Sequence, residues 1–133
     1  MNNEIFELIN DFNQTLLTLA MNIAESCPNS LVGQNFKDIK KNINDKNNLT
    51  KFIDLFTTKV LQYKTQIDSG DESFFMEKDY KSDLKECNDS YLSNVISVKS
   101  IWKDLSEDNK HIVITYFQIL CALSQGYFDS FQD

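Results

Sequence analysis

Residues 106–127 read SEDNKHIVITYFQILCALSQGY, and this stretch decides the fold class of the chain. Its part from Ile112 to Phe117 is rich in β-branched and aromatic residues, which are favoured in strands. The apolar pattern nevertheless continues through Leu123, which is too long for a single strand. Ser106 suits a helix N-cap, and the two acidic residues after it suit the positive end of a helix dipole. We therefore predict one helix over residues 106–127. Because it is apolar nearly all round, we expect it at the centre of the core.

Apolar residues that recur every three or four positions predict three more long helices. Residues 3–25 carry one such face, which ends before Pro28. Residues 48–69 carry a second, followed by Gly70 at the position of a C-cap. Residues 83–105 carry a third, with the heptad-like spacing of a helix–helix seam. The residues of this seam are Leu84, Cys87, Tyr91, Val95, Val98, Trp102 and Leu105.

Weaker signals complete the predicted fold. Residues 35–44 have a partial pattern that predicts a short helix, and residues 70–82 lose the periodicity and are expected to form a loop. The tight link at Leu105-Ser106 predicts that the last two long helices are antiparallel neighbours. The expected fold is all-α, an antiparallel bundle of four long helices plus a short helix. A chain of 133 residues suits a single domain, residues 1–133.

The charge of the chain limits the classes of molecule that it is expected to bind. The formal net charge is −7, and all 13 basic residues are lysine. Without arginine, the chain lacks the planar group that reads guanine or clamps phosphate bidentately. We expect no direct binding to nucleic acid, because such binding starts from a basic face. An acidic face has two interpretations: it meets a basic protein surface, or it only keeps the protein in solution.

Other features of the sequence favour an intracellular protein. The chain opens without a basic segment followed by an apolar core, so we expect no secretory signal. Its longest apolar stretch, from Ile112 to Leu123, is shorter than the roughly 20 residues of a membrane span. Cys27, Cys87 and Cys121 are odd in number and far apart, which favours reduced, buried thiols over a disulfide framework.

Catalytic groups are scarce in this sequence. The only histidine, His111, has no motif that joins it to a cysteine nucleophile. Asp108 and His111 share a helix face, but metal sites in helical bundles use two such pairs and further glutamates. None of the three glycines opens a phosphate-binding loop. We expect no catalytic residue, no metal and no cofactor. The alternative is a small enzyme with an unfamiliar site, whose candidate groups are Asp108, His111 and Cys121.

The predicted loop at residues 70–82 alternates acidic and aromatic residues, which helix building does not explain. One interpretation makes it a partner-binding segment, with apolar anchors that enter a pocket and acidic residues that steer the encounter. The other folds the same residues back to cap the bundle, which avoids an exposed apolar patch. The seam of residues 83–105 also has two interpretations: it packs against a helix of a partner chain, or it packs in the core of its own chain. The candidate partner-binding residues are Phe74, Phe75, Met76, Tyr80, Asp71 and Glu72.

A set of residues in the C-terminal half forms a recognisable pattern: Ile101-Trp102-Lys103-Asp104-Leu105-Ser106, Asn109-Lys110, Ile112, Tyr116-Phe117-Gln118-Ile119-Leu120, Leu123 and the upstream pair Phe74-Phe75. This pattern resembles that of small helical proteins encoded by nucleocytoplasmic large DNA viruses, the mimivirus-like giant viruses. The resemblance covers about half of the chain, and Thr115 departs from it where an aromatic or aliphatic residue is expected. The many Asn, Lys, Ile, Asp and Phe residues and the lack of arginine indicate an AT-rich coding genome, which agrees with such a source.

This resemblance implies a source and no activity. Together with the scarcity of catalytic groups, it leads us to expect a non-enzymatic helical protein–protein interaction module. Such a module would serve as an adaptor or structural subunit of a viral assembly, in the host cytoplasm or in the virion. Its expected partner is a protein, with a basic surface or a second copy as options, and neither nucleic acid nor a membrane. A further alternative is an acidic decoy that occupies the basic groove of a nucleic-acid-binding protein.

Overall fold

The computed structural model describes residues 3–87 and 89–132, and every regular element in this part of the chain is a helix. The all-α class predicted from the sequence is confirmed. The α-helices are α1 (Asn3–Ser26), α2 (Leu31–Gln34), α3 (Phe36–Ile43), α4 (Lys51–Lys59), α5 (Lys64–Ser69), α6 (Glu72–Glu77), α7 (Tyr91–Ile96) and α8 (Glu107–Asp129). Short 3-10 turns lie at η1 (Lys46–Asn48), η2 (Leu61–Tyr63), η3 (Val98–Ser100) and η4 (Trp102–Asp104).

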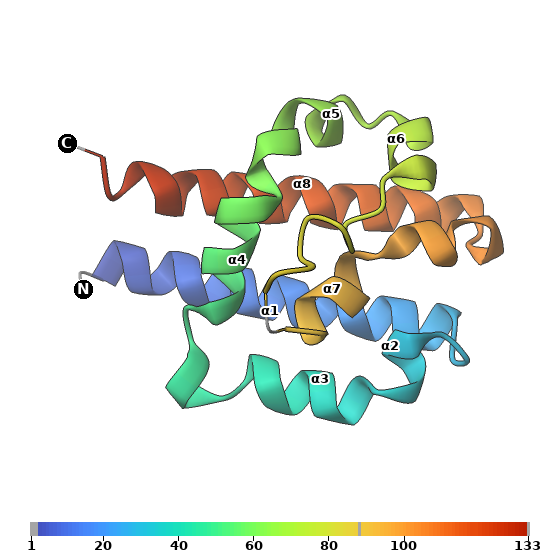
Figure 1. Ribbon diagram of the computed structural model, residues 1–133, viewed down its shortest axis with the longest axis horizontal. Helices are drawn as coiled ribbons and strands as arrows, with labels where there is room; N and C mark the ends of the chain where they lie inside the picture. The colour runs from blue at the N-terminus through green and yellow to red at the C-terminus, as the bar shows by residue number, and fades with distance from the viewer. Residues whose placement is uncertain (1–2, 88, 133) are drawn as a thin grey trace.

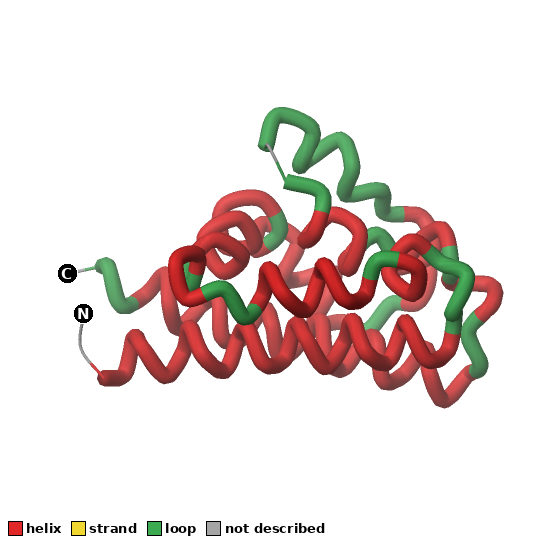
Figure 2. Tube along the Cα trace, turned by 90° about the horizontal axis from the view of Figure 1, so that it is seen from below, coloured by secondary structure: helices red, strands yellow, loops and turns green. Residues whose placement is uncertain are grey.

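The two long helices, α1 and α8, form an antiparallel pair that runs the length of the molecule (Figure 1). Leu8 of α1 packs against Gly126 of α8, so the end of one helix meets the start of the other. The shorter elements stack on one side of this pair (Figure 2). Both long helices were predicted, and Ser106 caps α8 by accepting the Asn109 N–H at 3.1 Å. The buried apolar residues of α1 are Ile9, Phe12, Leu16, Leu17, Leu19, Ala20 and Ile23.

Helix α4 crosses the long pair and is tied to both members. The ring of Phe56 in α4 meets Phe12 of α1 edge-on, with centroids 5.4 Å apart. The phenol of Tyr127 in α8 donates a hydrogen bond to Asp54 Oδ1 at 2.6 Å. These contacts fix the angle at which α4 lies on the two long helices.

The centre of the core is Phe117, near the middle of α8. Its ring meets Phe75 of α6 edge-on at a centroid distance of 5.4 Å and lies 6.2 Å from the ring of Tyr80. Phe75 also stacks on Trp102 at 5.6 Å. All four side chains are buried, and burial of one phenylalanine ring contributes about 1.5–3 kcal/mol. The segment between α5 and α8 therefore belongs to the core.

The predicted helix over residues 48–69 is present as α4, the turn η2 and α5 rather than as one helix. Thr57, Thr58 and Val60 are β-branched, and their restricted side-chain rotation weakens the α-helix at this point. Val60 is fully buried, and its carbonyl accepts the Tyr63 N–H at 2.9 Å in a tighter turn. The break redirects the chain so that α4 and α5 both reach α8.

The predicted helix over residues 83–105 is wrong. Residues 80–87 form turns, and the carboxylate of Asp89 then accepts the N–H groups of Tyr91 and Leu92 at 3.2 and 3.0 Å, which starts the short α7. Short polar side chains compete in this way with a continuing helix. The antiparallel neighbour of α8 is therefore α1. The seam residues nevertheless pack within this chain: Leu84, Val95, Val98, Trp102 and Leu105 are buried, and Cys87 and Tyr91 are half-buried.

Two short helices were not predicted. The expected loop at residues 70–82 contains α6, and the turn after α1 contains α2. Both begin with a side-chain cap: Asp71 accepts the Ser73 N–H, and Ser30 accepts the Gly33 N–H. Helices of four and six residues are too short to show a periodic pattern. The short helix expected at residues 35–44 is confirmed as α3.

Gly33 provides a test of the packing between α2 and the end of α1. A methyl group at Gly33 would lie 2.3 Å from the carbonyl oxygen of Pro28, which only a backbone shift can relieve. We expect Gly33→Ala to lower the free energy of unfolding by about 2 kcal/mol or more. Urea denaturation followed by the fluorescence of Trp102 measures this change.

Gly126→Ala is the matched control. There the new methyl group would lie 3.4 Å from the flexible Leu8 side chain, inside a helix that favours alanine over glycine by about 1 kcal/mol. This variant should be as stable as the parent or more so. Equal stability of the two alanine variants would contradict the packing described at Gly33.

Candidate interaction surface

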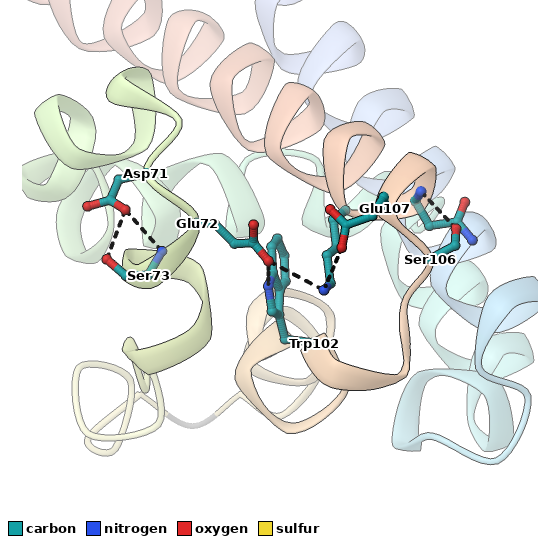
Figure 3. Close-up of polar contacts among 8 residues, drawn as sticks. Asp71, Glu72, Ser73, Trp102, Ser106 and Glu107 are labelled. Atoms are coloured by element: carbon teal, nitrogen blue, oxygen red, sulfur yellow. Dashed lines mark hydrogen bonds and ion pairs between the residues drawn. The ribbon is translucent and has the colours of Figure 1, made fainter.

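The acidic and aromatic segment after Gly70 folds back onto the helices. The Asp71 carboxylate accepts the N–H of Ser73 at 3.0 Å and its hydroxyl at 2.8 Å, which caps α6 (Figure 3). A helix of six residues is not stable in isolation, so α6 depends on its contacts with the rest of the chain. Phe75 supplies the buried part of those contacts.

Glu72 joins α6 to the start of α8 (Figure 3). The indole N–H of Trp102 donates to Glu72 Oε1 at 3.1 Å, and the Lys110 ammonium lies 3.4 Å from the same oxygen. Lys110 also lies 3.3 Å from the carboxylate of Glu107. The hydrogen bond from Trp102, followed by that from Lys110, lowers the pKa of Glu72. Glu72 therefore acts as an ionised link inside the chain.

A second polar cluster fixes the segment that follows α6. Lys78 donates to the phenol oxygen of Tyr63 at 2.8 Å and lies 2.6 Å from the Asp83 carboxylate, to which Tyr63 donates at 2.9 Å. Burial alone would lower the pKa of Lys78, but its hydrogen bonds to Asp83 and Tyr63 outweigh that effect and raise it. Lys78 is thus charged at neutral pH and fastens this segment to η2.

The aromatic residues predicted to anchor a partner point into the protein. Phe75 and Tyr80 are buried, and Phe74 is half-buried against the core. This is the capping arrangement that the sequence offered as the alternative. Met76 differs, because 49% of its surface is exposed. Partner binding by the six predicted residues stays a prediction, and in this conformation Met76 is the apolar member accessible to a partner.

The groups named for an unfamiliar enzyme do not converge. Asp108 and His111 are exposed on the first turns of α8, whereas Cys121 is fully buried about 15 Å further along the helix. Burial raises the pKa of Cys121 to about 12, so its thiol is protonated at neutral pH. Within the described residues, the His111 ring makes no hydrogen bond.

Two further features are absent from residues 3–87 and 89–132. In this range, no three side chains of the His, Cys, Asp and Glu types gather as ligands for a metal ion. No helix built from these residues has both the length and the apolar character that a membrane crossing requires.

The side of α8 that faces away from the core is largely apolar, and its charged residue, Asp129, lies at the C-terminal end. Between His111 and Asp129 the helix contains no charged residue, although 25% of the chain is charged. Ile112 and Ile119 are 38% and 40% exposed, and a shallow hollow of about 300 Å³ lies among the side chains on this side. We name this surface the α8 outer face. It consists of His111, Ile112, Thr115, Tyr116, Ile119, Ala122 and Asp129.

This exposure corrects one prediction. The sequence indicated that α8 is surrounded by core, because its residues are apolar nearly all round. The core covers only the inner side, where Val113, Phe117 and Leu120 are buried. Single exposed apolar side chains are normal on a monomeric protein, but Ile112 and Ile119 lie two turns apart on one side of the helix, beside the same hollow. The all-round apolar pattern is therefore the sequence signal that marked this surface, and it was interpreted as burial alone.

No protein-family model, no curated protein and no solved structure matches this chain. Its own surface is therefore the basis for a functional proposal.

The three thiols should fall into two reactivity classes. Cys121 is fully buried with a pKa of about 12, so at pH 8 only about one thiol in 10⁴ is ionised. Cys27 and Cys87 are half-buried and free. We expect a disulfide reagent at pH 8 to modify Cys27 and Cys87 in the native protein and Cys121 only after denaturation.

Cys27 should also react more slowly than a free cysteine, because burial and then the charge of Asp104 raise its pKa. A Cys121→Ala variant is the control, since it should lose the slow class and keep the fast one. Three thiols that react at one rate in the native protein would contradict the placement of Cys121.

Proposed function

We propose that the protein is a non-enzymatic protein–protein interaction module that associates through the α8 outer face, with a second copy of the chain as its partner. The observation that carries the proposal is an exposed helix face that has no charged residue between His111 and Asp129, on a chain with a net charge of −7. Burial of this face against an identical one removes apolar surface from water on both sides.

The ends of the face favour an antiparallel, two-fold arrangement. His111 and Asp129 lie about five helical turns apart on the same side of α8. Two antiparallel copies centred near Leu120 bring His111 of one copy close to Asp129 of the other. The same arrangement sets Ile119 of one copy over Ala122 of the other. A large side chain then faces a small one, which lets the two helices approach closely.

The size of the face sets the expected affinity. From His111 to Asp129 it is about 27 Å long and about 10 Å wide. Two such faces bury less than about 1,200 Å² in total, which is the range of weak and transient complexes. The proposal is therefore a reversible dimer with a dissociation constant in the micromolar range, rather than an obligate one.

The setting of the module is part of the same proposal. The resemblance of the C-terminal half supports a viral source, and within that source we propose the role of a subunit or adaptor of an assembly. The three free thiols are consistent with a reducing, intracellular environment. In an assembly that holds many copies together, several weak dimer contacts act at once, and their combined binding is much stronger than that of one contact.

Sedimentation equilibrium tests the proposal with the wild-type chain and an Ile119→Lys variant. Over about 5–500 µM, we expect the wild-type mass to rise from 15.5 kDa toward twice that value. The variant should dimerise at least about tenfold more weakly, because a buried unpaired charge is costly. Ile119 is 40% exposed in the monomer, so circular dichroism should show an unchanged helical fold.

Leu31→Lys is the matched control. Leu31 is 54% exposed on α2, and its replacement adds the same charge outside the α8 outer face. This variant should associate like the wild type. A wild-type chain that is monomeric throughout the concentration range, or an Ile119→Lys variant that dimerises equally well, would refute self-association through this face.

A further inference from the structure

A cleft between α6, η3 and η4 collects lysines in an otherwise acidic chain. It has a volume of about 450 Å³ and opens beside the exposed Met76. Lys99 and Lys103 come from the consecutive turns η3 and η4, and Lys81 comes from the turn after α6, 18 residues earlier than Lys99. We name it the lysine cleft. Its lining residues are Met76, Asp79, Lys81, Ser97, Lys99, Ser100 and Lys103.

The cleft lysines are not neutralised within the described part of the chain. None of their ammonium groups makes an ion pair or a hydrogen bond there. The lysines at 51, 64, 78 and 110 each pair with a carboxylate, so among the described residues the cleft lysines belong to the unpaired majority and differ from it by lying together around one hollow. Asp79 is the single acidic residue of the lining, and its carboxylate accepts the backbone N–H of Lys81 at 2.9 Å. Three lysines and one aspartate leave a local excess of two positive charges.

The remaining lining residues favour a peptide as the ligand. Ser97 and Ser100 donate their hydroxyl protons to the carbonyls of Ser93 and Ser97. Within the described residues no donor reaches their oxygens, which can therefore accept an N–H from a bound peptide. Met76, 49% exposed, adds an adaptable apolar contact beside the charges. A nucleic acid fits less well, because three cations on a chain of net charge −7 release few counterions.

We propose that the lysine cleft binds an acidic segment of a partner protein. Carboxylates of the segment meet Lys81, Lys99 and Lys103, and an apolar side chain of the segment packs on Met76. This site is separate from the α8 outer face, and the proposal does not depend on self-association.

Fluorescence anisotropy tests the proposal with a labelled ten-residue peptide of Glu and Asp that carries one central Phe. Truncation of Lys99 and Lys103 to alanine together should weaken binding about tenfold at low salt. The same double change at Lys40 and Lys41 of α3 alters the net charge equally, and it should change binding less than about twofold. Met76→Ala should weaken binding of this peptide but not of its Phe-to-Gly counterpart.

Three outcomes would overturn the proposal. Equal losses of peptide affinity in the two double variants would mean that the net charge of the chain, and not the cleft, determines binding. A lysine peptide or oligothymidylate that binds more tightly than the acidic peptide would assign the surface to another partner class. Failure of the Ile119→Lys variant to bind the acidic peptide would mean that the cleft requires the dimer. We expect that variant to bind the acidic peptide as the wild type does.

Discussion

The contact between the inner side of α8 and the rest of the chain holds the molecule together. This contact is densest at Phe117, because two aromatic rings pack against the Phe117 ring: Phe75 from α6 and Tyr80 from the turn after α6. The helices between α4 and α8 are each too short to be stable in isolation. They are helical because their apolar residues find a surface on α8, on α1 or on each other. Polar links such as Glu72 to Trp102 then fix the direction in which each short piece lies.

A helix that is apolar on all sides is most stable when all its sides are buried, but in this structure only the inner side of α8 is buried by the rest of the chain. Helices α1, α4 and α5 and the segment around Phe75 occupy the inner side of α8. No described element packs over Ile112 and Ile119, whose exposure is the direct result. The same sequence property therefore builds the core and leaves a largely apolar face exposed. Repulsion between chains of net charge −7 opposes their association, so the proposed dimer depends on the apolar contacts of this face.

Much of the fold follows from apolar spacing, and the failures have a common cause. The long helices α1 and α8 and the Ser106 cap were predicted because periodicity and capping are local properties. In residues 83–105 the spacing identified five buried residues, but it also included the half-buried Cys87 and Tyr91 and missed the buried Leu92 and Ile96. It did not reveal that Asp89 ends one segment and starts another through hydrogen bonds to the backbone. The lysine cleft was not predicted: Lys99 and Lys103 are close in the sequence, but only the tertiary fold brings Lys81 and Met76 to them. Met76 was predicted as a binding residue from the sequence, but its lysine surroundings were not.

Helix α8 serves the core with its inner side, and the proposed dimer places its outer side against a second copy. Two-dimensional ¹⁵N–¹H spectra of the wild-type chain, recorded from dilute to concentrated solution, test this most directly. We expect concentration-dependent shifts along α8 that are largest at Ile112, Thr115, Ile119 and Ala122, with the Trp102 indole signal unchanged. Spectra that do not depend on concentration, or shifts that gather on α3 instead, would contradict the claim.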